Sequence, residues 1–516
     1  MTKILYNIYE IKKTLKKLKT EKNMLFESTR GKSEKVNGSN AIITGIASDG
    51  GLYVPSFFPQ ISLEELKSFE EKDYAERTAF VLSKYLDEYD YDKLCSACEN
   101  AYKKFTGDPA PLVKVDENNY VLELYHGPTH AFKDMALTVL PYLLKEGCLI
   151  NGIKEKVLIL TATSGDTGKA ALEGFRDVDG VKICVFYPSE GVSKMQKLQM
   201  QTQSGNNVNV CGVVGNFDDC QSAVKKIFND KAVNKTLNEK GYAFSSANSI
   251  NFGRLAPQIA YYFSAYVDLA QSGEIAYGDK VNFCVPTGNF GNILACYYAK
   301  QMGLPVGKLI CASNKNNVLT DFFSFGKYDI NREFYKTTSP SMDILISSNL
   351  ERLIYEITGR NAELTAKRMK DLVEKGVYDI TEEEKEKLSN DFYASCCSEE
   401  DSQKTIEYYF DEYDYAIDPH TSVGLKVSDD FRKVFGENQK IVSLSTASPY
   451  KFPTDVLKAI DGKIEDDPFK ASEKICDLTA MPIPESIETL KEKSKRFTKI
   501  IDRNNILEEV LEFLNK

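Results

Sequence analysis

The chain has 516 residues, of which 42% are hydrophobic and 27% are charged, and its formal net charge is −10. The length predicts two or three domains, and the composition is typical of a globular protein with a substantial core. The acidic balance argues against nonspecific binding to nucleic acid or to a membrane surface, and no apolar run approaches the roughly 20 residues that span a bilayer. Twelve cysteines, most of them in apolar runs, predict a reduced protein of the cytoplasm.

The first 112 residues divide into a tail and a mixed segment. Residues 1–23 are rich in lysine and lack the apolar stretch of a signal peptide, so we expect a loose N-terminal extension. Residues 24–112 mix helical and extended patterns and are expected to form an N-terminal cap domain. Cys95 and Cys98 have no second pair or nearby histidine to complete a zinc site, so the sequence predicts no metal centre.

The most unusual segment is 126–134, with the sequence HGPTHAFKD, which contains two of the three histidines of the chain. Lys133 lies next to Phe132 and just before the apolar helical run Met135–Leu144, so we expect its side chain to be partly buried. Burial disfavours the charged form of an amine and lowers its pKa, which favours attack on an aldehyde. The alternative is a lysine at a helix start whose amine reaches the solvent.

From residue 156 onward, short β-branched runs alternate with helical patterns such as Gly168–Phe175 and Gly253–Leu269. This alternation is typical of an α/β fold, in which ligands lie outside the carboxyl ends of the parallel strands. The runs predicted to be buried strands are Val157–Thr163, Val181–Tyr187, Val208–Val214, Val281–Pro286, Leu309–Ala312 and Ile441–Thr446.

The polar turn at residues 163–168 follows the first of these strands and leads into a helix. Its small residues allow backbone N–H groups to converge, and the helix N-terminus adds a partial positive charge. The turn therefore predicts a site for an anion such as a carboxylate, the alternative being an ordinary strand–helix turn with a good N-cap. The candidate residues are Ser164, Gly165, Asp166 and Thr167.

A second polar turn, TGNFGN at residues 287–292, follows the strand predicted at Val281–Pro286 and also opens a helix. Two glycines three residues apart can bring backbone amides around a phosphate, and asparagines can add side-chain donors. Neither the Walker pattern nor the dinucleotide fingerprint is present here. Thr446 ends a later strand, where its hydroxyl could bond a ring nitrogen. The candidate phosphate-binding residues are Gly288, Asn289, Phe290, Gly291 and Asn292.

Three further divisions complete the expected domain organisation. Residues 113–462 are expected to form an α/β region of two lobes, the smaller at about 150–232. Residues 327–435, rich in charge and tyrosine, are expected to be a helical insertion. Residues 463–516 are expected to form a helical tail.

In this order, the segments resemble the fold-type II pyridoxal-phosphate enzymes, and within them threonine synthase. HGPTHAFKD resembles that family's Schiff-base lysine motif, TSGDTG its substrate-carboxylate loop and GNFGN its cofactor-phosphate loop. The resemblance extends from about residue 24 to residue 452. It departs from the family at 446–452, which reads TASPYKF where many members read TAHPAKF. Further matches are residues 28–30, 47–55, 248–254 and 418–421.

The resemblance implies two open, mostly parallel α/β domains with a cap and a helical insertion. It also implies conversion of O-phospho-L-homoserine and water into L-threonine and phosphate, the last step of threonine biosynthesis. Lys133 would carry pyridoxal 5'-phosphate and act as general base, and Thr446 would contact the cofactor ring. Residues 288–292 would hold the cofactor phosphate, and residues 164–167 the substrate carboxylate. The substrate phosphate is expected to bind Arg254, helped by Asn248, Ser249 and Asn251.

Two other readings stay open from the sequence. A related lyase, such as a threonine dehydratase or a phosphohomoserine lyase that yields 2-oxobutyrate, would use the same cofactor. A non-catalytic binding protein of the same fold is disfavoured because the lysine and both glycine-containing turns are intact. The expected partner is a small-molecule substrate, with no nucleic acid and no membrane, and the expected state is a monomer or homodimer.

Overall fold

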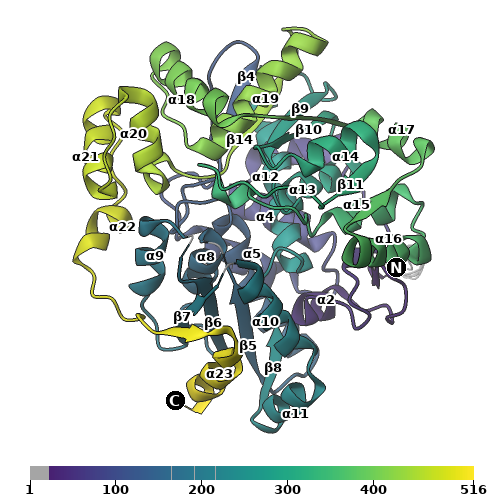
Figure 1. The fold of residues 1–516 in the computed structure, drawn as a ribbon. Coiled ribbons are helices and arrows are strands. Elements are labelled where there is room, and N and C mark those ends of the chain that lie inside the picture. Colours follow the sequence, from purple (N-terminus) through teal and green to yellow (C-terminus); the bar gives the residue numbers. More distant parts are fainter. Residues whose placement is uncertain (1–22, 164, 191, 216, 516) are drawn as a thin grey trace, which may run out of the picture.

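Two open β-sheets form the frame of the molecule, one in each of two lobes (Figure 1). The computed structural model describes residues 23–163, 165–190, 192–215 and 217–515. Helices cover both faces of each sheet and nearly all strand pairs are parallel, so the predicted α/β fold class is confirmed. Within the described residues, none of the helices combines the length and the apolar character that a membrane span needs.

The larger sheet has six strands in the order β13-β10-β9-β14-β4-β3, and only the pair β3 and β4 is antiparallel. Alternate residues of a strand face opposite layers of helices. In β9, Phe283 belongs to the core beneath α12 and α13, whereas Cys284 faces α19 on the other side. The strands are β3 (Leu112–Lys114), β4 (Asn119–Glu123), β9 (Val281–Pro286), β10 (Val306–Ser313), β13 (Phe392–Cys396) and β14 (Ile441–Ser445).

The smaller sheet has five parallel strands in the order β15-β7-β6-β5-β8. Its strand β5 shows the same alternation, since Val157 and Ile159 face α8 while Leu158 and Leu160 face α10 and α23. The strands are β5 (Lys156–Ala162), β6 (Val181–Pro188), β7 (Val208–Val214), β8 (Tyr242–Ser245) and β15 (Ile500–Asp502). The helices are α8 (Asp166–Phe175), α9 (Lys194–Gln201), α10 (Phe217–Asn229), α11 (Lys231–Glu239) and α23 (Ile506–Asn515).

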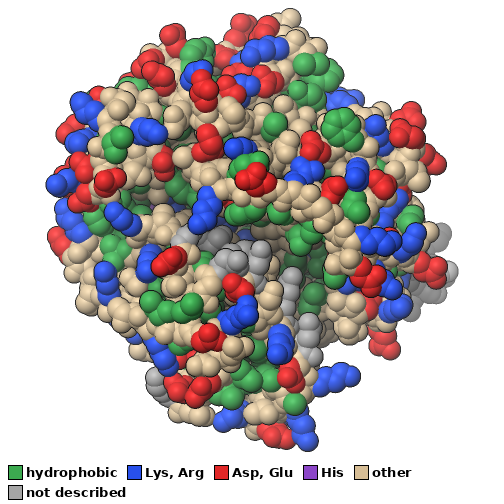
Figure 2. Space-filling view, in the orientation of Figure 1, with side chains coloured by type: hydrophobic (Ala, Val, Ile, Leu, Met, Phe, Trp, Pro, Cys, Tyr) green, Lys and Arg blue, Asp and Glu red, His purple; other side chains and the backbone are tan. Residues whose placement is uncertain are grey.

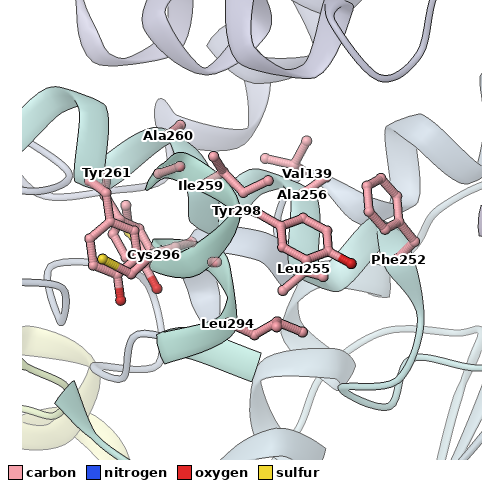
Figure 3. Close-up of a cluster of buried hydrophobic side chains, with 14 of the residues drawn as sticks. Val139, Phe252, Leu255, Ala256, Ile259, Ala260, Tyr261, Leu294, Cys296 and Tyr298 are labelled. Carbon is pink, nitrogen blue, oxygen red and sulfur yellow. The ribbon is translucent and has the colours of Figure 1, made fainter. Parts of the chain in front are cut away.

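The cap segment packs directly on the long buried helix α12 (Phe252–Gln271). Figure 3 shows Leu255 and Ile259 of α12 close to Leu294 and Tyr298 of α13 (Gly291–Gln301). The same hydrophobic cluster continues into the cap, so cap and larger lobe share one core. The cap and the connection that follows it contain β1 (Phe26–Ser28), β2 (Tyr53–Pro55), α2 (Gly38–Thr44), α3 (Leu63–Lys67), η1 (Ser68–Glu71), α4 (Tyr74–Ser83), α5 (Tyr91–Tyr102), α6 (Asp134–Leu137) and α7 (Leu140–Ile150).

The region 327–435 differs from the expected helical insertion, because its strand β13 extends the larger sheet and its helix α19 covers one face of that sheet. The other two strands, β11 and β12, form a small antiparallel pair. Its elements, with the helix that precedes them, are α14 (Val318–Phe325), β11 (Lys327–Asp329), η2 (Pro340–Met342), α15 (Leu350–Ile357), α16 (Ala362–Lys375), β12 (Val377–Asp379), α17 (Glu382–Asp391), α18 (Glu399–Tyr413) and α19 (Pro419–Phe435).

The C-terminal segment crosses from one lobe to the other (yellow in Figure 1). It begins beside the larger lobe, and it ends as strand β15 and helix α23 on the smaller sheet. The smaller lobe therefore extends beyond 150–232, to β8 and to the C-terminal residues. The remaining elements are η3 (Pro449–Lys451), α20 (Pro453–Asp461), α21 (Pro468–Thr479), α22 (Glu485–Glu488), η4 (Thr489–Glu492) and η5 (Arg503–Asn505).

Candidate active site

The loop that presents Lys133 is fixed by its own hydrogen bonds. The backbone N–H and the hydroxyl of Thr129 donate to the buried Asp134 carboxylate at 2.7 and 2.6 Å. A side chain at Gly127 would place its Cβ 2.5 Å from the Asp134 Cβ, so this close approach requires glycine. Lys133 stands at the N-terminus of α6, and its backbone position is therefore set before any ligand binds.

The strand end at Thr446 holds the same loop from the other side. Phe132 N–H donates to the Thr446 carbonyl at 2.9 Å, and Ala131 forms an isolated antiparallel bridge with Ala447. Thr446 is buried at the carboxyl end of β14, next to the lysine loop. Its hydroxyl contact to a cofactor ring stays a prediction.

The Lys133 amine lies in the interior, with 12% of the side chain exposed. Its Nζ is 3.5 Å from Asp166 Oδ2 and 3.4 Å from the Ser341 hydroxyl. Burial lowers the pKa of Lys133, the Asp166 carboxylate opposes that shift, and the cations Lys451 and Arg254 reinforce it. This environment favours a larger neutral fraction of the amine than a surface lysine has.

Asp166 begins helix α8, and its carboxylate is already shared among protein groups. Lys451 Nζ lies 2.8 Å from Oδ1, and the Gln196 side-chain amide donates to the same oxygen at 2.9 Å. Burial would raise the pKa of Asp166, but Lys451 and Lys133 together hold it well below its usual range. An ionised Asp166 repels a second carboxylate, so its side chain is not suited to the expected role in substrate binding.

The other residues of that turn keep the expected role open. Gly165 has φ of 151°, and a side chain there would meet the Gln196 amide at 2.6 Å. Thr167 is half-buried in the first turn of α8. Ser164 lies outside the described residues. Figure 2 shows the surface hollowed between the two lobes.

The turn at 287–292 is braced by the segment 347–349. Ser347 donates to the Gly288 carbonyl at 2.7 Å, and the Asn349 side-chain amide donates to the Asn289 carbonyl at 2.9 Å. Phe290 adopts a left-handed conformation with φ of 62° immediately before α13. These bonds fix the turn, and a helix start lacks intrahelical acceptors for its first N–H groups, so those of α13 are suited to bind a ligand.

Asn292 adds a buried donor at the start of α13. Its Oδ1 accepts hydrogen bonds from the hydroxyls of Tyr261 and Tyr262, whereas its Nδ2 has no partner among the described residues. An unpaired buried amide costs free energy unless a ligand accepts from it. The residues of this turn therefore fit the phosphate of pyridoxal phosphate.

Ser341, in η2, joins the phosphate turn to the lysine. Its hydroxyl contacts the Lys133 amine, and a Cβ at Gly288 would lie 2.8 Å from the Ser341 carbonyl oxygen. His420 accepts from the Ser341 N–H at 3.1 Å, and its other ring nitrogen lies 2.6 Å from the Asp418 carboxylate. The predicted lysine and the predicted phosphate turn are thus neighbours.

Arg254 is the unusual charge of the site. Its side chain is buried at the start of α12, and Nη1 donates to the Ala247 carbonyl at 2.8 Å. Its Nε has no hydrogen-bond partner, and no carboxylate forms an ion pair with it in the described part of the chain. Burial lowers the pKa of Arg254 to about 10, which still leaves it charged at neutral pH. A buried cation without a partner is costly, so the position is suited to an anion.

The residues before Arg254 have different roles. Asn251 caps α12 by accepting from the Gly253 N–H at 2.8 Å, and its amide donates to the carbonyls of Ile42 and Ser246. Its side chain is therefore engaged in the scaffold and not available as a substrate donor, contrary to the expectation. Asn248 and Ser249 are half-buried in the preceding turn, and their contact to substrate stays a prediction.

Sequence reasoning assigned no role to Lys451, Ser341 or Gln196, all of which contact Asp166. Lys451 coincides with the lysine of the family pattern TAHPAKF within the segment 446–452, and this coincidence was a signal in the sequence. Ser341 and Gln196 carry no local pattern, since only the tertiary fold brings them to the site.

The geometry, a part-buried lysine beside a glycine-containing phosphate turn at the carboxyl edge of a parallel sheet, defines a pyridoxal-phosphate enzyme of fold type II. Consistently, residues 106–384 match the family "Pyridoxal-phosphate dependent enzyme". Residues 25–102 match "Threonine synthase N terminus", and residues 421–513 match "Threonine synthase, C-terminal". The chain belongs to the threonine synthase family.

Individual related proteins and structures agree with this assignment. Threonine synthase from Pseudomonas aeruginosa is 39% identical over 441 residues, covering 84% of this chain and 90% of that protein. The crystal structure of pyridoxal-phosphate-bound threonine synthase from Brucella melitensis superposes with a TM-score of 0.84 at 36% identity, covering 95% of this chain and 98% of that one. Human threonine synthase-like 1 is 40% identical over 475 residues, which cover 90% of this chain but only 63% of that longer protein.

Proposed function

We propose that the protein is a threonine synthase that converts O-phospho-L-homoserine and water into L-threonine and phosphate. The observation that carries the proposal is Arg254, a buried guanidinium with a free Nε and no carboxylate partner among the described residues. Its charge acts on the Lys133 amine, so an anion on Arg254 would lie near the reacting atoms. A fork of N–H donors suits a phosphate better than a single ammonium does.

Pyridoxal phosphate, when bound, supplies an electron sink that stabilises negative charge at the substrate Cα. The turn at 288–292 would hold its phosphate, with the Asn292 amide as a buried donor. Lys133 would bear its aldehyde, and the amine is placed to take and return protons at Nζ. Ser341 and Asp166 hold that amine in position at 3.4 and 3.5 Å.

The substrate would then be held at both of its anionic ends. We assign its phosphate to Arg254 with Asn248 and Ser249 beside it, and its carboxylate to the N–H groups at the start of α8 with Thr167. Two fixed anchors orient the carbon chain between them and so lower the entropy that the reaction must lose. We assign the Asp166 side chain no part in the carboxylate site, because its carboxylate is already paired with Lys451 and Gln196.

The central test is an assay of the purified protein with O-phospho-L-homoserine that measures threonine, phosphate and 2-oxobutyrate together. We expect threonine and phosphate in equal amounts. Formation of 2-oxobutyrate instead would identify a lyase that does not add water at Cβ, and would contradict the proposal.

The lysine assignment is tested by Lys133→Ala, which we expect to lose the absorbance of lysine-bound cofactor and all turnover. Lys169→Met is the matched control, since Lys169 is also a lysine of the interior but pairs with Glu173 at 3.1 Å. Retained covalent cofactor in Lys133→Ala would exclude Lys133 as its attachment point.

We also propose that the enzyme works in the cytoplasm as a monomer or homodimer on a small-molecule substrate. In support, all twelve cysteines are free thiols and most are buried. On the face drawn in Figure 2, basic and acidic side chains are interspersed, which offers no continuous basic surface for nucleic acid.

A further inference from the structure

The Asp166 carboxylate lies between the buried Lys451 and the part-buried Lys133, and the two lysines contact it at different distances. Lys451, in η3, is 1% exposed, and its Nζ lies 2.8 Å from Asp166 Oδ1. Lys133 Nζ lies 3.5 Å from the other carboxylate oxygen. Gln196 donates to Oδ1 at 2.9 Å and Ser341 to Oδ2 at 3.0 Å. The carboxylate is therefore bound most closely by the lysine that has no assigned chemistry.

The Lys133 amine has two opposing requirements, since it must be held in place by a carboxylate and must also be available in its neutral form. An amine that must react with an aldehyde needs an accessible neutral form. A buried carboxylate that paired with Lys133 alone would stabilise the ammonium form instead. A second cation on the same carboxylate weakens that stabilisation.

We propose that Lys451 is a positioning residue that takes the larger share of the Asp166 carboxylate, so that Asp166 orients the Lys133 amine without holding it as an ammonium ion. The inference rests on the proposed role of Lys133 as the cofactor-bearing amine. It names a residue that acts through Asp166, not one that touches the substrate.

The surroundings of Lys451 fix its position independently of Lys133. Its Nζ also donates to the Thr129 carbonyl at 3.0 Å and to the Gln199 side chain at 3.2 Å. The residues that depart from the family pattern support the same turn. Ser448 caps η3, and the buried Tyr450 donates its hydroxyl to the Met481 carbonyl. The departure TASPYKF thus anchors the turn that presents Lys451.

Several charged groups affect the expected change in the pKa of Lys133. Those that act on Lys133 are Asp166 from α8, Lys451 from η3 and Arg254 from α12. Lys451 also acts on His130, Asp134 and Lys169. Loss of Lys451 removes a repulsive cation and frees Asp166, and both changes raise the pKa of Lys133.

The test follows covalent binding of pyridoxal phosphate to cofactor-free protein by absorbance, as a function of pH. For Lys451→Met we expect the pH midpoint of the binding rate to rise by roughly 1–2 units, which slows binding roughly 10–100-fold below the midpoint. Lys451→Arg, which keeps the charge, should retain a midpoint near that of the wild type. Lys169→Met should leave the midpoint in place, because Lys169 has its own partner in Glu173.

A second variant keeps the inference testable if Lys451→Met does not fold. Asp166→Asn removes the carboxylate that Lys451 balances, and we expect its midpoint to fall below that of the wild type. An unchanged midpoint in either folded variant, with or without a slower rate, would overturn the inference and leave Lys451 a packing residue. Absence of covalent binding in the wild type would instead overturn the assignment of Lys133, so the two failures are distinct.

Discussion

Two deeply buried arginines lie near the site, Arg254 on α12, which is 3% exposed, and Arg352 on α15, which is 0% exposed, and they differ in their hydrogen bonds. Arg352 donates from Nε to the Tyr53 carbonyl at 2.9 Å, from Nη1 to the Asn349 side chain at 2.5 Å and from Nη2 to the Ile250 carbonyl at 2.6 Å. Arg254 makes one such bond and has an unpaired Nε. Burial lowers the pKa of each guanidinium to about 10.

The difference separates a structural arginine from a ligand-binding one. Arg352 joins the cap, the turn before α12 and the brace of the phosphate turn, so its donors are used within the fold. Arg254 keeps donors that the fold does not use. Burial alone therefore does not identify a binding residue, whereas burial with unsatisfied donors does.

The largest effect is expected for Arg352→Met, which tests whether Arg352 is a structural arginine. Three buried acceptors would lose a charged donor, and we expect the free energy of unfolding to fall by about 3–5 kcal/mol. Chemical unfolding of the cofactor-loaded enzyme measures this loss. An unfolding midpoint equal to that of the wild type would show that Arg352 does not hold these segments together.

Arg254→Met should act on the reaction instead of the fold. Loss of a charge-assisted bond to the substrate phosphate costs about 1.5–3 kcal/mol, so we expect kcat/KM for O-phospho-L-homoserine to fall roughly 10–150-fold. The unfolding midpoint should not fall, because the substitution removes a buried charge without a partner. Unchanged kcat/KM would show that Arg254 does not bind the substrate phosphate and is a structural residue.

The smallest expected effect is stabilisation by inorganic phosphate, the proposed product. At ten times its Kd, phosphate that binds only the folded cofactor-loaded enzyme should raise the free energy of unfolding by about 1.4 kcal/mol. Chloride at equal ionic strength is the control. An equal stabilisation of the Arg254→Met variant by phosphate would show that phosphate binds at a site other than Arg254.

The sequence predicted those elements that a run of consecutive residues specifies. The strands β5, β6, β7, β9 and β14 lie within a few residues of the predicted runs, and the two polar turns do open helices. Strand β13 escaped prediction because its run FYASC contains no β-branched residue and pairs only at the sheet edge. Lys451 and Ser341 reach Asp166 from distant segments, so their contacts follow from tertiary packing. Asn251 was assigned to substrate because the bond that its side-chain amide donates to the Ile42 carbonyl, far along the chain, follows only from tertiary packing.

The path of the C-terminal segment has a consequence for how the molecule is made. Strand β15 pairs with β7 and so covers an edge of the smaller sheet whose other strands are synthesised long before it. Until the ribosome has completed the larger lobe and the segment beyond it, β7 presents an open edge that can recruit another chain. The smaller lobe is therefore protected against misassembly only late in translation, when β15 has been synthesised and can pair with β7.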